Sequence, residues 1–298
     1  MKKIAIIGSI NTDFCFKTDT LPKPSETITG NNFEIKFGGK GANEAVAIAR
    51  QGESVALFGK IGEDTYSKEN LKNLKKEKVE TKYIETASTC GGVAGIMLDK
   101  QTNSIIVVPG ANGEVDIEYI KKHKNDILSY DIFCLQLEIP LSTTEFLIDM
   151  LAKAKKTIIF NPSPIVDLNK KLLQKCSYIV VNEIEIQKLP SFKTIEQIMK
   201  DFKGKLIFTC GKDGAYFYDK KKVEHLPALD IQNVVDTTGA GDTFLGSLAV
   251  KLGQGASIKE AIEYANICAG LKTTKLGAQT GMPTKKEIEK YLKEKSHS

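Results

Sequence analysis

The sequence predicts an α/β domain with a doubly wound, mainly parallel sheet and a small β-sheet lid. Short apolar runs rich in β-branched residues alternate with helix-like segments along most of the 298 residues. Two stretches, at about 13–37 and 88–108, contain successive strands with no helix between them. A hydrophobic content of 41% and a charged content of 27% are typical of a globular protein. We therefore expect one domain over 1–298, with lid strands contributed by those two stretches.

The elements follow in a regular order. The run "KIAIIGSI" predicts a buried first strand, and "GANEAVAIARQG" predicts a helix that ends at Gly52, a residue suited to a helix C-terminus. Strand patterns follow at 54–62, 130–138, 157–161, 177–182 and 205–211, helix patterns at 143–156, 169–175 and 183–189, and a hairpin pattern at 214–226. Buried strands that alternate with helices indicate a parallel sheet covered on both faces.

Composition excludes several classes of function. The net charge of +5 is modest, and the densest lysine stretches alternate with glutamate at helical spacing, which indicates solvated helix faces and no nucleic-acid partner. The six cysteines form no CxxC pair, so we expect reduced thiols in a cytoplasmic protein. No run approaches the ~20 apolar residues of a membrane span. The first apolar stretch is interrupted by Asn11 and Asp13, unlike a signal peptide.

A glycine turn within "VVDTTGAGDTFLGSLAV" suggests an anion site. Gly239, Ala240 and Gly241 have little bulk, so their amides can approach a ligand, and the helix that follows also favours an anion. Asp242 would repel that anion, which favours a role as the base that deprotonates an attacking hydroxyl in phosphoryl transfer. The alternative is a simple helix cap. No GxxxxGK[ST] is present, and Phe244 stands where the dinucleotide fingerprint needs its third glycine.

The segment "FGGKGANEAVAIARQG" suggests a binding site for a polar ligand. Its glycines permit close backbone approach, Lys40 supplies a cation, and Asn43 both donates and accepts hydrogen bonds. With Asn11 and Asp13 at the end of the first strand, these groups could read several sugar hydroxyls. Taken alone, Lys40 could equally be a solvated surface lysine.

Together, "GGKGANEAVAIARQG" and "DTTGAGDTFLGSLAV" resemble the two signatures of the ribokinase-like (PfkB) carbohydrate kinases. The motifs come in that order, and the resemblance covers about 4–283. It implies a ribokinase-like fold and ATP-dependent phosphorylation of the 5-hydroxyl of D-ribose, which gives D-ribose 5-phosphate and ADP. Mg²⁺ is expected as a cofactor and K⁺ as a monovalent activator.

The resemblance also assigns roles to residues. Asp242 is the expected base, and Gly239, Ala240 and Gly241 form the expected anion hole. The expected sugar-binding residues are Asn11, Asp13, Gly39, Lys40, Asn43, Glu138 and Asp242. The expected ATP-binding residues are Asn182, Glu185, Thr209, Gly211, Gly214, Gly241 and Asn266, with Glu185 organising Mg²⁺ through water. Asp236, Thr238, Lys272, Lys275, Gly277 and Gly281 are expected around the monovalent cation, largely through backbone oxygens.

Some alternatives stay open. In "LKTTKLGAQTG", Lys272, Lys275 and Gly281 depart from the residues usual in the family, which makes K⁺ the least secure part of the resemblance. Glu138 and Glu185 could be helix-start carboxylates, and Asn182 a turn residue. The substrate could be deoxyribose, another sugar or a nucleoside, or the chain could be a non-catalytic sugar-binding protein, although Asp242 argues against the latter. An apolar lid face would favour a homodimer.

Overall fold

Two sheets organise the structure. In the computed structural model, which describes residues 1–100, 102–189, 194–219 and 221–296, nine strands form one sheet in the order β13-β12-β11-β10-β9-β8-β1-β4-β5. Its strands are β1 (Ile4–Ile7), β4 (Val55–Ile61), β5 (Ile84–Thr86), β8 (Ile132–Leu135), β9 (Thr157–Phe160), β10 (Tyr178–Val181), β11 (Leu206–Thr209), β12 (Ala215–Tyr218) and β13 (Val223–Leu226). All pairings are parallel up to β11, and the β12 and β13 hairpin is antiparallel. The predicted fold class is confirmed.

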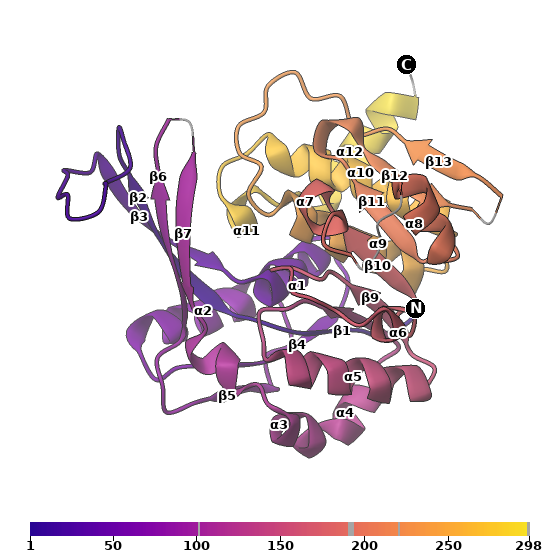
Figure 1. Ribbon diagram of the computed structural model, residues 1–298, viewed down its shortest axis with the longest axis horizontal. Helices are drawn as coiled ribbons and strands as arrows, with labels where there is room; N and C mark the ends of the chain where they lie inside the picture. The colour runs from indigo at the N-terminus through magenta and orange to yellow at the C-terminus, as the bar shows by residue number, and fades with distance from the viewer. Residues whose placement is uncertain (101, 190–193, 220, 297–298) are drawn as a thin grey trace.

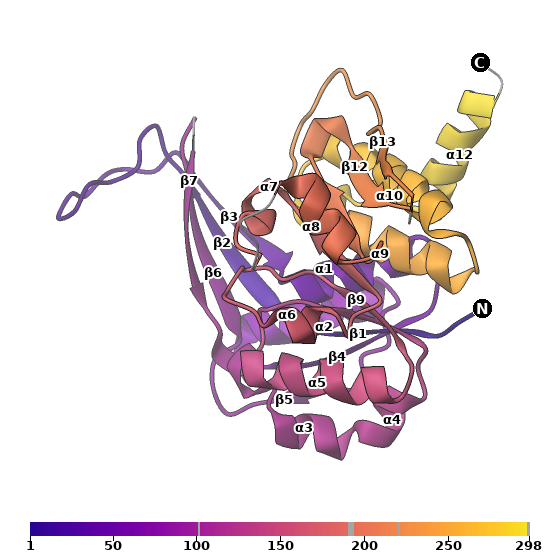
Figure 2. The same ribbon diagram turned by 45° about the vertical axis from the view of Figure 1, so that its right-hand side comes forward.

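Helices cover both faces of this sheet. The longer helices are α1 (Lys40–Arg50), α2 (Thr65–Lys76), α5 (Leu141–Lys153), α9 (Ala240–Gly253), α10 (Ile258–Thr273) and α12 (Lys285–Ser296). The shorter ones are α3 (Ile117–Lys122), α4 (Lys124–Leu128), α6 (Lys170–Leu173), α7 (Glu183–Ile186), α8 (Ile195–Asp201) and α11 (Ala278–Gly281), with 3₁₀ turns η1 (Gly110–Glu114) and η2 (Gly211–Asp213). Helices α3, α4 and α5 lie on one side of β1 and β4, and α1 and α9 on the other (Figures 1 and 2).

The core explains the continuous apolar strands. Every residue of β1 and β8 is buried, because both faces of the central strands are covered. Strand β1 pairs with β4 on one side and β8 on the other, so the chain order reverses at β1. Ligands of open α/β sheets bind beyond the carboxyl ends of the strands at such a reversal. The fold therefore places a candidate site just after β1 and β8.

A second sheet projects from that edge. It has the order β3-β2-β6-β7, with β2 at Asn11–Lys17, β3 at Asn32–Gly38, β6 at Gly92–Leu98 and β7 at Asn103–Val108. The β2–β6 pairing is parallel and the other two are antiparallel. Figure 1 shows this sheet as an arm beside the main domain, and we call it the lid. Its strands match the two predicted stretches, except that β2 begins at Asn11 and β3 ends at Gly38, just outside 13–37.

Two helices, α9 and α10, differ from the sequence prediction. Helix α9 starts at Ala240, and its N-cap is Gly239, whose φ of 79° is left-handed and suits glycine. Asp242 therefore lies inside the first turn and caps nothing, so the helix-cap alternative is wrong. Helix α10 was missed, although Ser257 and Glu260 form a capping box, a signal that a sequence can carry. No helix within the described ranges is long and apolar enough to cross a membrane.

Candidate active site

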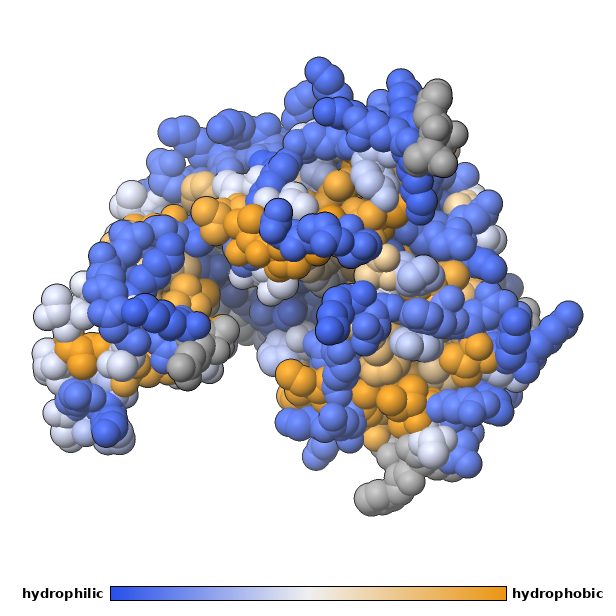
Figure 3. Space-filling view, turned by 90° about the horizontal axis from the view of Figure 1, so that it is seen from above, coloured by the Kyte–Doolittle hydropathy of each residue, from blue (hydrophilic) through white to orange (hydrophobic). Residues whose placement is uncertain are grey.

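The predicted sugar residues meet where the lid joins the main domain. Asn11 and Asp13 lie on β2, Lys40 and Asn43 on α1, and Glu138 in the loop after β8. Helix α9 packs against α1 and brings Asp242 to the same place. Seen from above, the surface is hollowed between the lid and the main domain (Figure 3). Residues about 200 positions apart in the sequence thus share one site.

Asp242 is the central carboxylate of this site. Its side chain is 10% exposed and accepts a hydrogen bond of 2.7 Å from Asn43 Nδ2. Lys40 Nζ lies 4.0 Å from Asp242 Oδ1. A Cβ added at Gly241 would meet no atom within 4 Å, so the space before the glycine turn is open to a ligand. The Asp242 carboxylate thus lies in the first turn of α9 next to the glycine turn, in which the Ala240 backbone N–H donates to the Thr237 carbonyl at 3.1 Å.

A chain of amides orients Asn43. Its Oδ1 accepts a hydrogen bond of 3.1 Å from Gln279 Nε2, and Gln279 Oε1 accepts one of 2.8 Å from Asn73 Nδ2. Because Gln279 is a donor to Asn43, the Asn43 amide presents its NH₂ to Asp242. Asn43, expected to hold sugar, is thus placed to position the base. Nothing in the sequence marked Gln279 or Asn73, which belong to α11 and α2.

The Glu138 carboxylate is hydrogen-bonded to the backbone N–H of Lys40. Glu138 Oε2 accepts a hydrogen bond of 2.9 Å from the Lys40 backbone N–H and another from the Ser9 hydroxyl. Burial alone would lower the pKa of Lys40, but the carboxylates of Asp242 and Glu138 outweigh it and raise that pKa. Lys40, whose side chain is 26% exposed, is therefore a partly buried cation beside two carboxylates, with some contact with solvent left. Ser9, next to the first strand, was missed.

Asp13 is a strongly perturbed carboxyl group in the site. Burial, with the charges of Glu138 and Asp242, raises its pKa to about 7, although Lys36 acts in the opposite direction. A Cβ at Gly38 would lie 2.2 Å from Asp13 Oδ2, so only glycine leaves room for this carboxyl group. A carboxyl group in a cleft whose pKa is shifted to near 7 is typical of a functional site.

Asn11 is fixed by a residue that the sequence analysis did not select. Its Oδ1 accepts a hydrogen bond of 2.6 Å from Asn112 Nδ2, and Asn112 Oδ1 accepts one of 2.9 Å from the Ile10 backbone N–H. At Gly39, φ is 88°, and an added Cβ would lie 2.7 Å from the Asn11 backbone nitrogen. The backbone around Asn11 and Gly39 is therefore closely packed, which orients the Asn11 amide.

The expected nucleotide residues form a second group. Asn182 and Glu185 make a capping box on α7: Asn182 Oδ1 accepts from the Glu185 backbone N–H at 2.9 Å, and Glu185 Oε2 accepts from the Asn182 backbone N–H at 3.0 Å. Asn182 is therefore a turn residue that caps α7, and Glu185 is a carboxylate in the first turn of that helix, as the structural alternatives for these two residues proposed. Asn161 Nδ2 also donates to Glu185 Oε2 at 3.2 Å. Asn161, missed by the sequence analysis, follows β9 as Asn182 follows β10.

The remaining nucleotide residues surround the η2 turn and α10. Thr209 Oγ1 donates to the Val181 carbonyl at 3.2 Å, and Gly211 and Gly214 have positive φ angles of 49° and 95°. Asn266 Nδ2 donates to the carbonyls of Leu226 and Pro227 at 2.9 and 3.1 Å. In this structure Asn266 thus ties α10 to the segment after β13.

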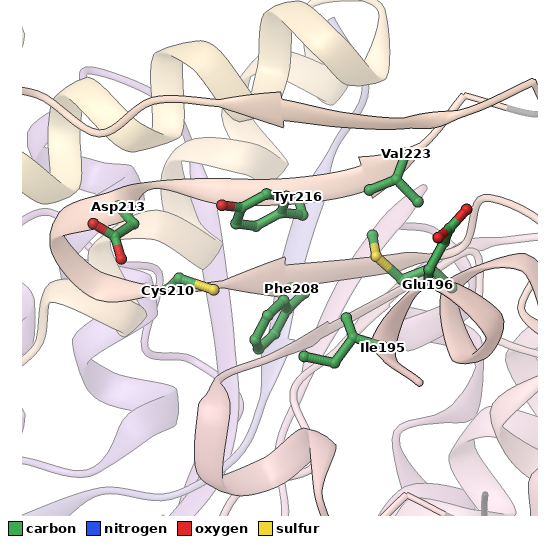
Figure 4. Close-up of a pocket in the computed structure, with 8 residues that line it drawn as sticks. Ile195, Glu196, Phe208, Cys210, Asp213, Tyr216 and Val223 are labelled. Carbon is green, nitrogen blue, oxygen red and sulfur yellow. The ribbon is translucent and has the colours of Figure 1, made fainter. Parts of the chain in front are cut away.

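A pocket of about 360 Å³ lies beside this turn (Figure 4). It is lined by Ile195, Glu196, Met199, Phe208, Cys210, Asp213, Tyr216 and Val223. These residues come from α8 and the β11–β13 region, and none is among the expected site residues. The pocket adjoins Gly211 and Gly214, and its lining includes two carboxylates, Glu196 and Asp213.

The residues expected around a monovalent cation also converge. Asp236 accepts hydrogen bonds from the Thr238 and Gly277 backbone N–H groups at 2.9 and 2.8 Å. Burial opposes ionisation, yet these bonds and the nearby Lys272 ammonium hold the pKa of Asp236 below its usual value. However, Lys272 Nζ itself lies among the oxygens, 2.7 Å from the Asp236 carbonyl. This arrangement does not fit a further cation at the same oxygens.

Glu185 is a candidate protein group for Mg²⁺. The described part of the chain contains no cluster of three or more His, Cys, Asp or Glu side chains that could hold a metal. Mg²⁺ in kinases is commonly held by one or two carboxylates, waters and substrate phosphates. The buried carboxylate of Glu185 fits that mode.

Comparison with known proteins gives one consistent result. A family model described as pfkB family carbohydrate kinase matches residues 1–285. A ribokinase of Bacillus subtilis is 38% identical over 293 residues, which covers 98% of this chain and 100% of the relative. A ribokinase structure from Thermotoga maritima superimposes with a TM-score of 0.90 at 34% identity, covering 98% of this chain and 100% of that one.

A second solved structure carries ligands. The Arabidopsis thaliana ribokinase complexed with ribose and ATP is 28% identical, with a TM-score of 0.87 and coverage of 98% of this chain and 99% of that one. The match of the family model extends over both motifs and all the residues discussed above. The buried aspartate behind a bare glycine turn and these full-length similarities lead to one conclusion: the chain belongs to the pfkB family of carbohydrate kinases.

Proposed function

We propose that the protein transfers the γ-phosphoryl group of ATP to the 5-hydroxyl of D-ribose, giving D-ribose 5-phosphate and ADP. The observation that carries this proposal is the buried Asp242, held by Asn43 at 2.7 Å beside the open glycine turn and the sugar-binding candidates. A relative with 38% identity is named a ribokinase, and a similar structure contains ribose and ATP. The site chemistry and the comparisons thus support the same reaction.

Asp242 is the proton acceptor in this mechanism. As the ribose 5-oxygen attacks the γ-phosphorus, its proton passes to the Asp242 carboxylate, and the bond to the departing ADP oxygen breaks. The amides of Gly239, Ala240 and Gly241 donate to the phosphoryl oxygens as negative charge develops there. Lys40, 4.0 Å from Asp242, adds positive charge on the same side. Mg²⁺, organised by Glu185 through water, would neutralise charge on the ATP phosphates.

The remaining polar groups hold the sugar. Asn11, Asp13 and Glu138 approach the same space from two β-strand ends, and Gly38 and Gly39 keep the backbone close. Carboxylates and amides in this number can read several hydroxyls of a small polar ligand. Turnover of ribose, deoxyribose, other pentoses and inosine by coupled ADP release tests the assignment. Ribose should give the highest kcat/KM, and a higher value for a nucleoside would replace ribose in this proposal.

The pKa of Asp13 predicts a pH dependence for sugar binding. The ionised carboxylate accepts hydrogen bonds from hydroxyls, and with a pKa of about 7 it is mostly protonated at pH 6 and mostly ionised at pH 8. Ribose affinity should therefore rise about tenfold over this range. Calorimetric titration of the protein with ribose without nucleotide measures it. Asp13→Asn should flatten the profile, and a flat profile in the unaltered protein would contradict the prediction.

The same shift has a consequence for stability. The folded-state pKa is above the ordinary value of 3.8, so between about pH 4 and pH 7 the folded state retains a proton that the unfolded chain has lost. The contribution of Asp13 to stability therefore falls as the pH rises through that window. Near pH 8, the neutral side chain of Asp13→Asn should leave the melting temperature unchanged or higher.

The lid suggests a homodimer. In the strand register, Phe14 lies opposite Ile35 and Gly95, and Gly95 lies opposite Ile106, so these residues share the face that points away from Asp13. The exposed apolar residues of that face are Phe16, Phe33, Ile35, Ile106 and Val108. Such a contiguous apolar face favours association.

We expect the lid face to pair with the same face of a second copy. Light scattering should then give about twice the chain mass of 32.7 kDa at micromolar concentration. Ile106→Lys should shift the protein to the monomer mass, because a charge is placed in the interface. A monomeric unaltered protein under these conditions would rule the pairing out.

A further inference from the structure

A buried lysine lies behind the glycine turn. Lys272, in the last turn of α10, has a side chain that is 0% exposed, and lysine is rarely buried unless it is paired. Its Nζ donates to the Asp236 carbonyl at 2.7 Å and makes a longer contact of 3.4 Å with the Lys275 carbonyl. Asp236 Oδ2 lies 4.0 Å away. The ammonium group thus has two carbonyl oxygens and one carboxylate around it.

These oxygens are the ligands that a hard metal cation would use. Hard cations prefer oxygen ligands, and carbonyl and carboxylate oxygens present the negative charge that such ions need. The ammonium of Lys272 supplies one positive charge at the same point. A second monovalent cation at these oxygens would lie within about 3–4 Å of it and be repelled. The side chain and an added cation therefore compete for one place.

The surrounding residues leave space for this side chain. A Cβ added at Gly281 would lie 3.0 Å from Lys272 Cε and 3.0 Å from the Lys275 carbonyl oxygen, closer than most real Cβ contacts. The Lys275 ammonium turns outward to pair with Glu287, so Lys275 offers only its carbonyl to Lys272. Because Gly281 has no side chain, the long side chain of Lys272 fits beside it.

The same oxygens are connected to the catalytic turn. Asp236 Oδ1 accepts from the Thr238 backbone N–H at 2.9 Å, one residue before the N-cap Gly239. Asp236 Oδ2 accepts from the Gly277 backbone N–H at 2.8 Å, immediately before α11. A Cβ at Gly239 would in turn lie 3.1 Å from Ala278 Cα, so the two segments are in close contact. Through Asp236, the charge at Lys272 Nζ therefore holds both the segment at Thr238, before the glycine turn, and the segment at Gly277, before α11.

We propose that the Lys272 ammonium is a built-in cation that holds the glycine turn in its anion-binding conformation, so that the protein needs no monovalent metal activator. Lys272 is a positioning residue, since its contacts are to Asp236 and Lys275 and not to the ligand space. This inference replaces the K⁺ expected from the sequence. The test of this inference by turnover rests on the proposed kinase function, whereas its test by melting temperature does not.

The first test uses the unaltered protein. Turnover of ribose and ATP is measured in KCl, NaCl and tetramethylammonium chloride at equal ionic strength, with the melting temperature of the ligand-free protein in each salt. We expect rates within about twofold and equal melting temperatures, because the cation is part of the chain. Activation by K⁺ of fivefold or more would overturn the inference.

The second test removes the charge. Lys272→Ala leaves the oxygens around an open space, so turnover should fall at least tenfold in tetramethylammonium and recover several-fold in K⁺ or NH₄⁺. K⁺ should also raise the melting temperature of this variant by about 2–4 °C. Lys272→Met keeps the bulk without the charge and should be slow in all three salts. Lys259→Ala, a half-exposed lysine at the start of the same helix, is the matched control and should behave like the unaltered protein.

The outcomes separate the two proposals. Normal turnover of Lys272→Ala in tetramethylammonium would overturn the built-in cation. A protein that turns over no ribose would refute the proposed substrate, but the melting temperatures of Lys272→Ala with and without K⁺ would still decide the inference. If Lys272→Ala does not fold in any salt, the salt comparison of the unaltered protein decides it.

Discussion

Replacing Asp242 by asparagine is expected to lower kcat by about 10²–10⁴-fold, the usual range for a lost general base. The amide has nearly the same shape as the carboxylate and can still accept the bond from Asn43, so the turn should persist. ATP affinity should hold or increase, since a negative charge near the γ-phosphate is removed. Ribose affinity should fall only modestly. Steady-state kinetics with calorimetric titration of each ligand measures these effects.

The melting temperature distinguishes a base from a structural group. Asp242 lies beside Glu44, a buried carboxyl group whose pKa is raised well above its usual value by burial and by the charge of Asp242. Because Asp242→Asn removes a negative charge close to Glu44, the melting temperature of this variant should stay close to normal. Asp116→Asn, the same change at the N-cap of α3, is the matched control and should keep full activity. Near-normal turnover with early melting in Asp242→Asn would show that the aspartate is structural.

Replacing Asp13 by alanine is expected to weaken ribose binding by about 1–3 kcal/mol, or roughly 5–150-fold, with ATP binding unchanged. The loss follows because sugar hydroxyls that pair with this carboxylate would lie in the closed site without an acceptor. The melting temperature should not fall, since ionising Asp13 among Glu138 and Asp242 is unfavourable in the folded state. Calorimetry of ribose binding at pH 8 measures the loss, because Asp13 is ionised there in the unaltered protein.

An aspartate on the same lid provides the control. Asp19 follows β2 and pairs with Lys100 at 3.3 Å on the exposed end of the lid. Asp19→Ala should leave ribose and ATP binding unchanged. If Asp13→Ala binds ribose as well as Asp19→Ala does, the sugar does not contact Asp13, and the site must be assigned to other residues.

Much of the fold was predictable because its signals are local. Continuous apolar strands such as Ile4–Ile7 indicate burial on both faces, and the alternation of strands with helices indicates parallel pairing. The two glycine motifs were readable for the same reason, since the positive φ angles at Gly39 and Gly239 are a local backbone requirement. Helix α10 was missed, because its apolar periodicity is weak even though its capping box is local.

The sequence by itself determined the fold class, the two motifs and the residue types of the site: a base, a lysine, amides and bare glycines. Only the tertiary structure decided how these residues are used. It showed that Asn43 is oriented by Gln279 and Asn73, and that Glu138 is held by Ser9 and the Lys40 backbone. These contacts join segments up to 236 residues apart, and no local pattern encodes such a distance.

The contrast is sharpest at Lys272. The sequence indicates a lysine near the end of a helix, where a solvated side chain that complements the helix dipole is the ordinary expectation. The structure instead buries its ammonium among the Asp236 and Lys275 carbonyls, beside a glycine that leaves it room. The physical reason is that burial of a charge depends on oxygens from other residues, here Asp236 and Lys275, and only folding brings Asp236 to the end of α10.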